Sequence, residues 1–238
     1  MTTTTDLVAG QQQLPAEVQA KMNERIAADI KRLGAIGGKD AIRITQDKKF
    51  ELPNGDVLDR VEGIIVDFVY RNEYYTDAFN RKQIKPPVCF AISSESVGMK
   101  PSPNSPELQD EGKGCDRCQQ NQWGSSPTNN GKACKNTVYI ALLPANATPE
   151  DPIWTIKTSP TAIKHFNGYI AKLAHTHHTS KDGVITRIFF DPGSAYASVR
   201  FEAIGLNEAY AATSARTEEA RARLLQEPDL TQTEAEAP

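Results

Sequence analysis

The stretch RVEGIIVDFVYRNEYY, residues 60–75, decides the fold of this chain. It is rich in β-branched and aromatic residues, a composition typical of a β-strand. Gly63 near its beginning indicates a bulge or a sharp bend. Because side chains alternate along a strand, we expect one face of it to carry Ile64, Val66, Phe68 and Tyr70.

Further strands are predicted on both sides of this stretch. Two short candidates precede it, and two strands, a helix and a hairpin follow it. The helix is marked by Ser159 as a cap and Pro160 as its first residue. The order of one long bent strand, two strands, a helix and two strands is that of an OB-fold, a five-stranded barrel that binds oligonucleotides or oligosaccharides. We therefore predict a mainly β protein with an OB-fold barrel, an insert between its first two strands, and N- and C-terminal helices.

The chain divides into segments of different character. Its first residues are rich in Thr and Gln, and the last ones are acidic. The expected segments are a disordered N-terminus (1–15), an N-terminal helix (16–36), an OB-fold domain (37–206) with a metal-binding insert (about 80–136), a C-terminal helix (207–226) and an acidic tail (227–238).

Composition and charge limit the class of protein. The 238 residues are 39% hydrophobic and 24% charged, which is ordinary for a globular protein. No stretch is apolar enough for a membrane helix, and the first residues lack the pattern of a signal peptide. We therefore expect a protein of the reducing cytoplasm, without a membrane partner, in which disulfides are rare. Residues 37–206 carry 20 basic and 19 acidic side chains, whereas residues 207–238 carry 3 and 7.

Three of the four cysteines lie in the Gly-, Asn- and Ser-rich loop of residues 114–135. Cys115 and Cys118 form a C-x2-C turn, which lets two thiolates approach one zinc ion, and Cys134 follows in GKACK. Cys89 is the remaining cysteine and completes a set of four, although a histidine is the alternative fourth ligand. An all-thiolate site has no open position, so we predict structural zinc. A redox pair or ordinary buried thiols are the alternatives.

Aromatic and basic side chains gather in the same part of the chain. Aromatic rings stack on the bases of single-stranded nucleic acid, and cations follow its backbone. The predicted nucleic-acid-binding residues are Tyr70, Arg71, Tyr74, Tyr75, Arg81, Lys82, Lys85, Arg117, Trp123, Lys132, Lys135, Tyr139 and Trp154. We expect some of these aromatics to be core residues, and Tyr74, Tyr75 and Trp123 are the strongest candidates because their neighbours are polar.

Motifs of catalysis are lacking in the sequence. It has no phosphate-binding loop, no G-x-S-x-G and no HExxH, so an enzyme is not expected. The acidic tail could compete for a basic groove and recruit partner proteins of replication or recombination. Two other readings remain: a zinc-ribbon adaptor or virion-associated module that binds protein through the insert, and a sequence-specific transcription factor, for which the helix of residues 161–175 is poorly suited.

Four stretches taken together resemble a known family. VDFVYRNEYY, PPVCF, CDRCQQNQWGS with GKACK, and the acidic C-terminus resemble the zinc-containing single-stranded DNA-binding proteins encoded by tailed bacteriophages, over about residues 60–205. The resemblance implies an OB-fold and protection of replication or recombination intermediates in the cytoplasm of the infected bacterium. It also implies a zinc site formed by Cys89, Cys115, Cys118 and Cys134.

Overall fold

The protein is described from a computed structural model, which covers Lys21 and residues 40–77, 85–128, 130–148, 150–194 and 197–231. The chain divides into two units at residue 39, and all described residues except Lys21 belong to the second. Apart from Lys21, the helix expected over residues 16–36 falls outside the described residues. So does the acidic tail beyond residue 231.

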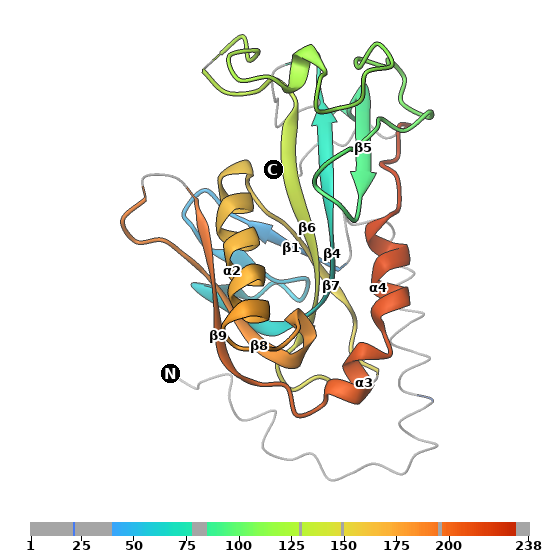
Figure 1. Ribbon diagram of the computed structural model, residues 1–238. Helices are drawn as coiled ribbons and strands as arrows, with labels where there is room; N and C mark the ends of the chain where they lie inside the picture. Colours follow the sequence, from blue (N-terminus) through green and yellow to red (C-terminus); the bar gives the residue numbers. More distant parts are fainter. Residues whose placement is uncertain are drawn as a thin grey trace. The chain divides into compact units, whose positions relative to one another are not determined.

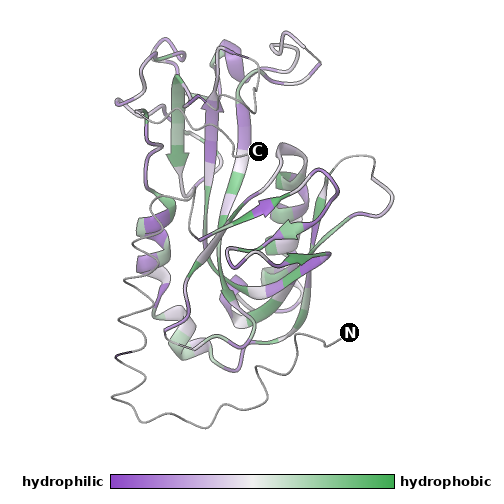
Figure 2. Ribbon diagram, turned by 180° about the vertical axis from the view of Figure 1, so that it is seen from behind, coloured by the Kyte–Doolittle hydropathy of each residue, from purple (hydrophilic) through white to green (hydrophobic). Residues whose placement is uncertain are grey.

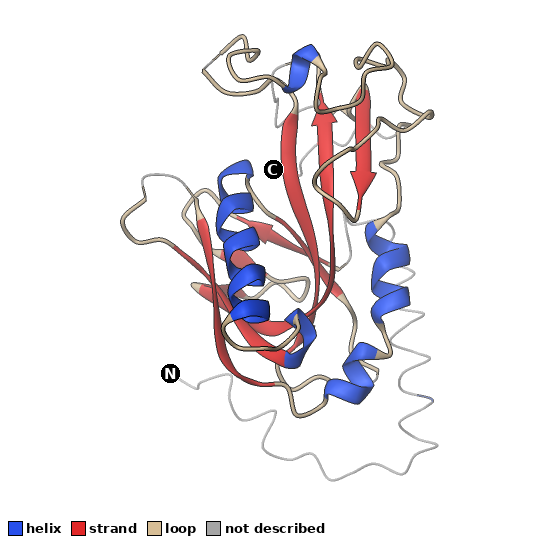
Figure 3. Ribbon diagram, in the orientation of Figure 1, coloured by secondary structure: helices blue, strands red, loops and turns tan. Residues whose placement is uncertain are grey.

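The described residues are mainly β (Figure 3). No helix among them is long and apolar enough to cross a membrane. The strands are β1 (Ala41–Ile44), β2 (Phe50–Glu51), β3 (Val57–Leu58), β4 (Arg60–Tyr74), β5 (Cys89–Ser93), β6 (Lys135–Pro144), β7 (Trp154–Lys157), β8 (Val184–Phe190) and β9 (Val199–Leu206). The helices are α2 (Ile163–His175), α3 (Tyr210–Ser214) and α4 (Thr217–Leu224), with short 3-10 turns η2 (Gln119–Asn121), η3 (Pro160–Ala162) and η4 (Lys181–Gly183).

All nine strands belong to one curled, open sheet (Figure 1). Its order is β3-β2-β1-β7-β6-β4-β8-β9, and β5 pairs with β4 off this path. All pairs are antiparallel except β1 with β7. The prediction of a mainly β, barrel-like fold is confirmed at this level. The sheet stays open because β1, rather than β9, lies along the free edge of β7.

The long strand β4 is the centre of this sheet. Its beginning pairs with β8, and the rest pairs with β6 on one side and β5 on the other. Gly63 lies where β8 and β6 both pair with it, and an added Cβ there would lie 2.5 Å from the carbonyl oxygen of Leu143. The glycine is therefore required by a close approach of two backbones.

A β-bulge between Ile65 and Asp67 changes the phase of alternation along β4. Ile64 and Val66 pack in one apolar cluster with α4, whereas Phe68 and Tyr70 pack in another with α2. The expectation that these four side chains share a face is therefore wrong. The extra residue reverses which side of the sheet each later side chain meets.

The two helical layers cover opposite faces of the sheet (Figure 1). Helix α2 supplies Phe166, Tyr169 and Leu173 to the larger cluster, and α4 supplies Ala220 and Leu224 to the smaller one. One end of each of β4, β5 and β6 extends beyond both helices into long loops. The residues of these loops are largely hydrophilic, as the purple in Figure 2 shows.

Several local expectations need correction. The expected insert, about residues 80–136, contains β5 and η2 in its described part, so it is more than a loop. Ser159 precedes η3 but makes no capping hydrogen bond to the backbone amides of that turn. The second strand of the predicted hairpin is β9, which begins at Val199. Two short helices, α3 and α4, lie in the segment expected to be one C-terminal helix.

Candidate metal centre and binding surfaces

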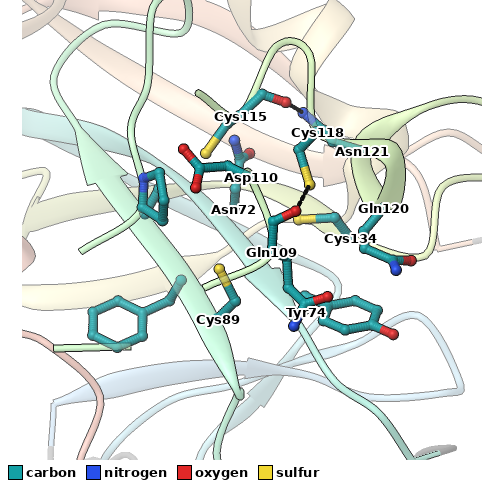
Figure 4. Close-up of a pocket in the computed structure, with 13 residues that line it drawn as sticks. Asn72, Tyr74, Cys89, Gln109, Asp110, Cys115, Cys118, Gln120, Asn121 and Cys134 are labelled. Carbon is teal, nitrogen blue, oxygen red and sulfur yellow. Dashed lines mark hydrogen bonds between the residues drawn. The ribbon is translucent and has the colours of Figure 1, made fainter. Parts of the chain in front are cut away.

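The four cysteines lie together at the end of β4 (Figure 4). Cys89 is the first residue of β5, and Cys134 directly precedes β6, so these two flank the end of β4 from its neighbouring strands. Cys115 and Cys118 come from the loop between β5 and β6. All four are buried, none forms a disulfide, and all border one cavity of about 20 Å³.

Hydrogen bonds fix the turn that carries the C-x2-C pair. The Asp110 carboxylate accepts bonds from the backbone amides of Gly112 (3.1 Å) and Gly114 (3.0 Å). Gly114 has a φ of 81°, a conformation that favours glycine, and it directs the chain into Cys115. The side-chain amide of Asn121 then donates to the carbonyl of Cys115 at 2.9 Å. The backbone of the insert therefore presents both thiols toward the cavity.

The last cysteine is joined to the same turn through the backbone. The amide of Cys134 donates to the carbonyl of Gln120, in η2, at 2.8 Å. The hydroxyl of Ser125 accepts a bond from the amide of Ala133 at 2.9 Å. These contacts tie the beginning of β6 to the C-x2-C turn.

Burial favours the protonated thiol at three of the four cysteines. It raises the pKa of Cys115 to about 11 and that of Cys134 to about 12, and it also raises the pKa of Cys89. The Cys118 thiol donates to the carbonyl of Gln109 at 3.3 Å. With the side chains placed in this way, no three His, Cys, Asp or Glu residues within the described part form a group that could hold a metal ion.

All four cysteines nevertheless line one shared cavity. Figure 4 shows the four sulfurs approaching it from different sides, with Asn72 and Tyr74 also at its wall. Its volume is enough for one atom-sized occupant. The three histidines at the end of α2, His175, His177 and His178, are exposed and do not line this cavity. Asp110 also lines the cavity, but its carboxylate accepts bonds from two backbone amides, so the four thiols are the remaining donor set.

Alternation in β4 separates the predicted nucleic-acid-binding residues. Tyr74 lies on the face with the cysteine cavity, which it lines. Tyr75 lies on the opposite face, where its hydroxyl donates to Glu73 at 3.2 Å. Tyr70 packs against both the α2 cluster and the small cluster of Cys115, and its hydroxyl donates to Asn167 at 2.8 Å. These three tyrosines therefore do not form one surface.

Arg71 holds the C-terminal segment and is not free to bind phosphate. It is 7% exposed, and its Nη2 donates to the carbonyls of Leu224 (2.6 Å) and Gln226 (2.7 Å). Its guanidinium also lies 4.2 Å from the centre of the Tyr139 ring. The sequence-based assignment of Arg71 as a phosphate contact is therefore corrected. The face of the Tyr139 ring is covered by this guanidinium and is therefore not free to stack on a base.

A buried carboxylate, Glu73, lies beside this pair. Glu73 accepts a bond from Lys157 Nζ at 2.6 Å and from the hydroxyl of Tyr139 at 3.4 Å. Burial alone lowers the pKa of Lys157, but the charge of Glu73 outweighs it, so this pKa is raised. Burial and the same carboxylate also raise the pKa of Tyr75. Cross-strand pairing of Tyr139 with Lys157 brings these groups together, and that register is not visible in the sequence.

The remaining predicted residues differ in how freely they reach solvent. Trp154 is half-buried against the α2 cluster, and Lys85 forms an ion pair with Asp77 at 2.6 Å. By contrast, Trp123 is 80% exposed, and Arg117 is exposed on the same loop. The exposed Lys135 contacts the carbonyl of Lys132, whose own Nζ donates to Asn121. Arg81 and Lys82 lie outside the described residues.

A second contact of the C-terminal segment reaches the insert. The Glu227 carboxylate accepts hydrogen bonds from Ser102 Oγ (2.5 Å) and Asn104 Nδ2 (2.8 Å), and these bonds lower its pKa. The first acidic residue after α4 is thus held on the cysteine-bearing insert. Sequence reasoning missed this contact because the partners are more than 120 residues apart.

Comparisons with models of protein families, with curated proteins and with solved structures found no match to this chain.

Proposed function

We propose that this protein binds single-stranded DNA without catalysing a reaction, and that a zinc ion held by four cysteines stabilises the insert that contributes to binding. The observation that carries the proposal is the gathering of four buried, unpaired cysteines around one small cavity, beneath a loop with an exposed tryptophan. Large exposed aromatics on a loop fixed from below are suited to base stacking.

Zinc fits the donor set. Thiolates bind zinc at about 2.3 Å, usually in closed tetrahedral sites. The raised pKa values mean that Cys115 and Cys134 are protonated without a metal, so metal binding would release protons. Cys89, Cys115, Cys118 and Cys134 would be the ligands, and the bound ion would fix the C-x2-C turn to the ends of β5 and β6.

The strand pairing supports an OB-like architecture. An OB-fold pairs its first strand with the second and fourth, its second with the third, and its fourth with the fifth. The pairs of β4 with β6 and β8, of β6 with β7, and of β8 with β9 follow this pattern. The pair that would close the barrel, β7 with β9, is replaced by β7 with β1. We therefore propose that the sheet is an open variant of the OB-fold barrel.

The acidic tail has a proposed role as well. Because Glu227 contacts Ser102 and Asn104, the C-terminal segment reaches the insert just before the rest of the acidic tail begins. The acidic residues that follow could recruit replication or recombination proteins in the cytoplasm of an infected bacterium.

Fluorescence titration tests the proposal. The chain has two tryptophans, and Trp154 packs against the core, so the variant Trp154→Phe leaves Trp123 as the reporter. We expect oligo-dT to quench it strongly, duplex DNA to quench it weakly, and added salt to reverse the effect. Metal analysis of the same sample should give about one zinc per chain, and Cys118→Ser should lower that content. Absence of quenching and of any gel shift by oligo-dT, with zinc present, would remove the DNA proposal.

A protein-binding adaptor is the second candidate, because the insert also exposes apolar side chains. Val97 is 74% exposed, Leu108 58% and Trp123 80%. Exposed residues of this kind also occur at protein interfaces. If Val97→Ser and Leu108→Ser leave oligo-dT binding unchanged but abolish capture of a host protein, the adaptor explains the insert better.

A further inference from the structure

We propose that an open hollow on the outer face of β8 is a stacking subsite for one base of single-stranded DNA. The inference rests on the proposed function and extends it to residues that lie outside the insert. The hollow has a volume of about 370 Å³, within the range of small-ligand sites. Its wall is built from the β1–β2 turn, the beginning of β4, and strands β8 and β9.

Phe189 is the aromatic surface of this hollow. Its neighbour Ile188 is fully buried on the α2 face, so alternation turns Phe189 to the other side of the sheet. Phe190, which also lines the hollow, stacks on Phe50 at 4.4 Å. Phe189 instead belongs to none of the apolar clusters in the described part of the chain and makes no ring–ring contact there. A half-buried ring that packs in none of these clusters is available to a base.

Arginines flank this ring. Arg60 and Arg200 are the cross-strand partners of Phe189, from β4 and β9 respectively. Side chains of directly opposed residues lie on the same face of a sheet. Arg60 also lines the hollow, and its side chain is 63% exposed. A base stacked on Phe189 would therefore have a guanidinium beside it for its phosphate.

Arg60 is the cation best able to accept a new partner. Its Nε contacts Glu62 at 3.3 Å, and its two terminal nitrogens have no ion pair or hydrogen bond within the described residues. Glu62 is shared, because Arg187 also donates to it at 2.9 Å. Two arginines thus compete for one carboxylate, which leaves guanidinium donors for a phosphate.

The hollow also contains the carboxylate of Glu202, which should repel the phosphates of a bound strand. This carboxylate pairs with Arg187 at 3.5 Å. With Lys48 and Asp59, the wall carries three cations and two carboxylates. Such a nearly balanced charge favours stacking over general attraction to phosphate, which suits a single strand better than a duplex. Lys48 also donates to the carbonyl of Ser194 at 2.6 Å, which holds the β8–β9 loop at the side of the hollow.

Photo-crosslinking with a short oligo-dT that carries one 5-iodouracil locates the stacked base. We expect mass spectrometry to find the crosslink in the peptide that contains Phe189. Phe189→Leu should weaken oligo-dT binding about 5- to 150-fold, the loss of one stacked base. Arg60→Gln should weaken it and lower the salt slope by about 0.7, whereas Glu202→Gln should strengthen it. Tyr210→Leu, a change at an exposed aromatic of α3, is the matched control and should change nothing.

The outcomes separate this inference from the proposed function. Wild-type binding with crosslinks confined to the insert, and with Phe189→Leu within twofold of wild type, refutes the hollow and leaves the DNA-binding proposal standing. Absence of binding by the wild type to any oligo-dT refutes both. Circular dichroism and thermal unfolding of each variant show whether a weaker affinity reflects lost folding.

Discussion

Replacement of Arg71 by methionine should destabilise the protein by releasing its C-terminal segment. Arg71 is buried in β4 and donates to the carbonyls of Leu224 and Gln226, at the end of α4. Its charge also lies over the ring of Tyr139. Methionine keeps most of the side-chain volume but has no donor, so the variant removes the hydrogen bonds and leaves packing nearly intact.

The expected loss follows from these contacts. Each hydrogen bond from a charged group contributes about 1.5–3 kcal/mol, and a partly desolvated cation–π contact contributes about 0.5–2 kcal/mol. Two effects reduce the sum. The carbonyl of Gln226 is only partly buried, so water can replace the lost donor. Arg71 Nε is buried without a partner, and its desolvation cost disappears in the variant. We expect a net loss of about 2–4 kcal/mol.

Urea unfolding measures this loss. With a slope of about 2 kcal/mol/M, the midpoint should fall by about 1–2 M. Hydrogen exchange should increase first in α4, since its last carbonyls lose their anchor. Lys164→Met, an exposed change on α2, is the control and should stay within about 0.5 kcal/mol of wild type.

A second substitution separates a structural arginine from a phosphate contact. Arg71→Lys keeps the charge but loses the fork that reaches two carbonyls. If Arg71 anchors α4, lysine should still lower stability and leave oligo-dT affinity nearly unchanged. The reasoning is refuted if Arg71→Met is as stable as wild type and its oligo-dT affinity falls about tenfold. The side chain would then contact DNA instead of stabilising the fold.

Other changes have opposite or localised effects. Gly63→Ala should destabilise the protein by about 1–3 kcal/mol in urea unfolding, because the new Cβ meets the Leu143 carbonyl. Gly168→Ala in α2 should instead stabilise it by about 0.5–1 kcal/mol, because no atom lies within 4 Å of an added Cβ there. Equal effects of the two substitutions would contradict this contrast. The folded-state pKa of Glu227 is lowered, so its bonds to the insert are present above its unfolded pKa of about 4.3 and are lost as pH falls through the folded value. Hydrogen exchange near the C-terminus should therefore increase only on acidification. The variant Glu227→Gln should remove this pH dependence. Chelation of zinc should raise exchange in residues 85–134 while α2 stays protected, and global unfolding would contradict this.

The sequence predicts local features of the cysteine site well because they depend on spacing. The C-x2-C turn is a property of four consecutive residues, and the chain has only four cysteines to complete a set. The structure brings these side chains to one cavity, although metal binding itself stays a prediction. The main strands of the sheet are also predicted, since β-branched and aromatic runs mark them directly.

The surfaces could not be predicted because they depend on long-range register. A single bulge after Ile65 reverses the faces of the later β4 side chains, so Tyr70 and Arg71 meet different helices from those that strict alternation implies. Arg71 is anchored to a residue 153 positions away. The hollow at Phe189 depends on pairing among three strands, and no local pattern of the sequence indicates it.

The cysteine-bearing end of the sheet depends on links other than apolar packing. Its own cluster has three buried members, Ala91, Met99 and Cys115, while the two larger clusters lie beside the helices. Burying one methionine contributes about 1.5–3 kcal/mol, which is small against the entropy of ordering a long insert. A structural zinc is worth about 10–16 kcal/mol in small peptides, so it would dominate the stability of this part. Independently of any metal, the C-terminal segment links the insert to the sheet, because Arg71 holds the end of α4 and Glu227 binds Ser102.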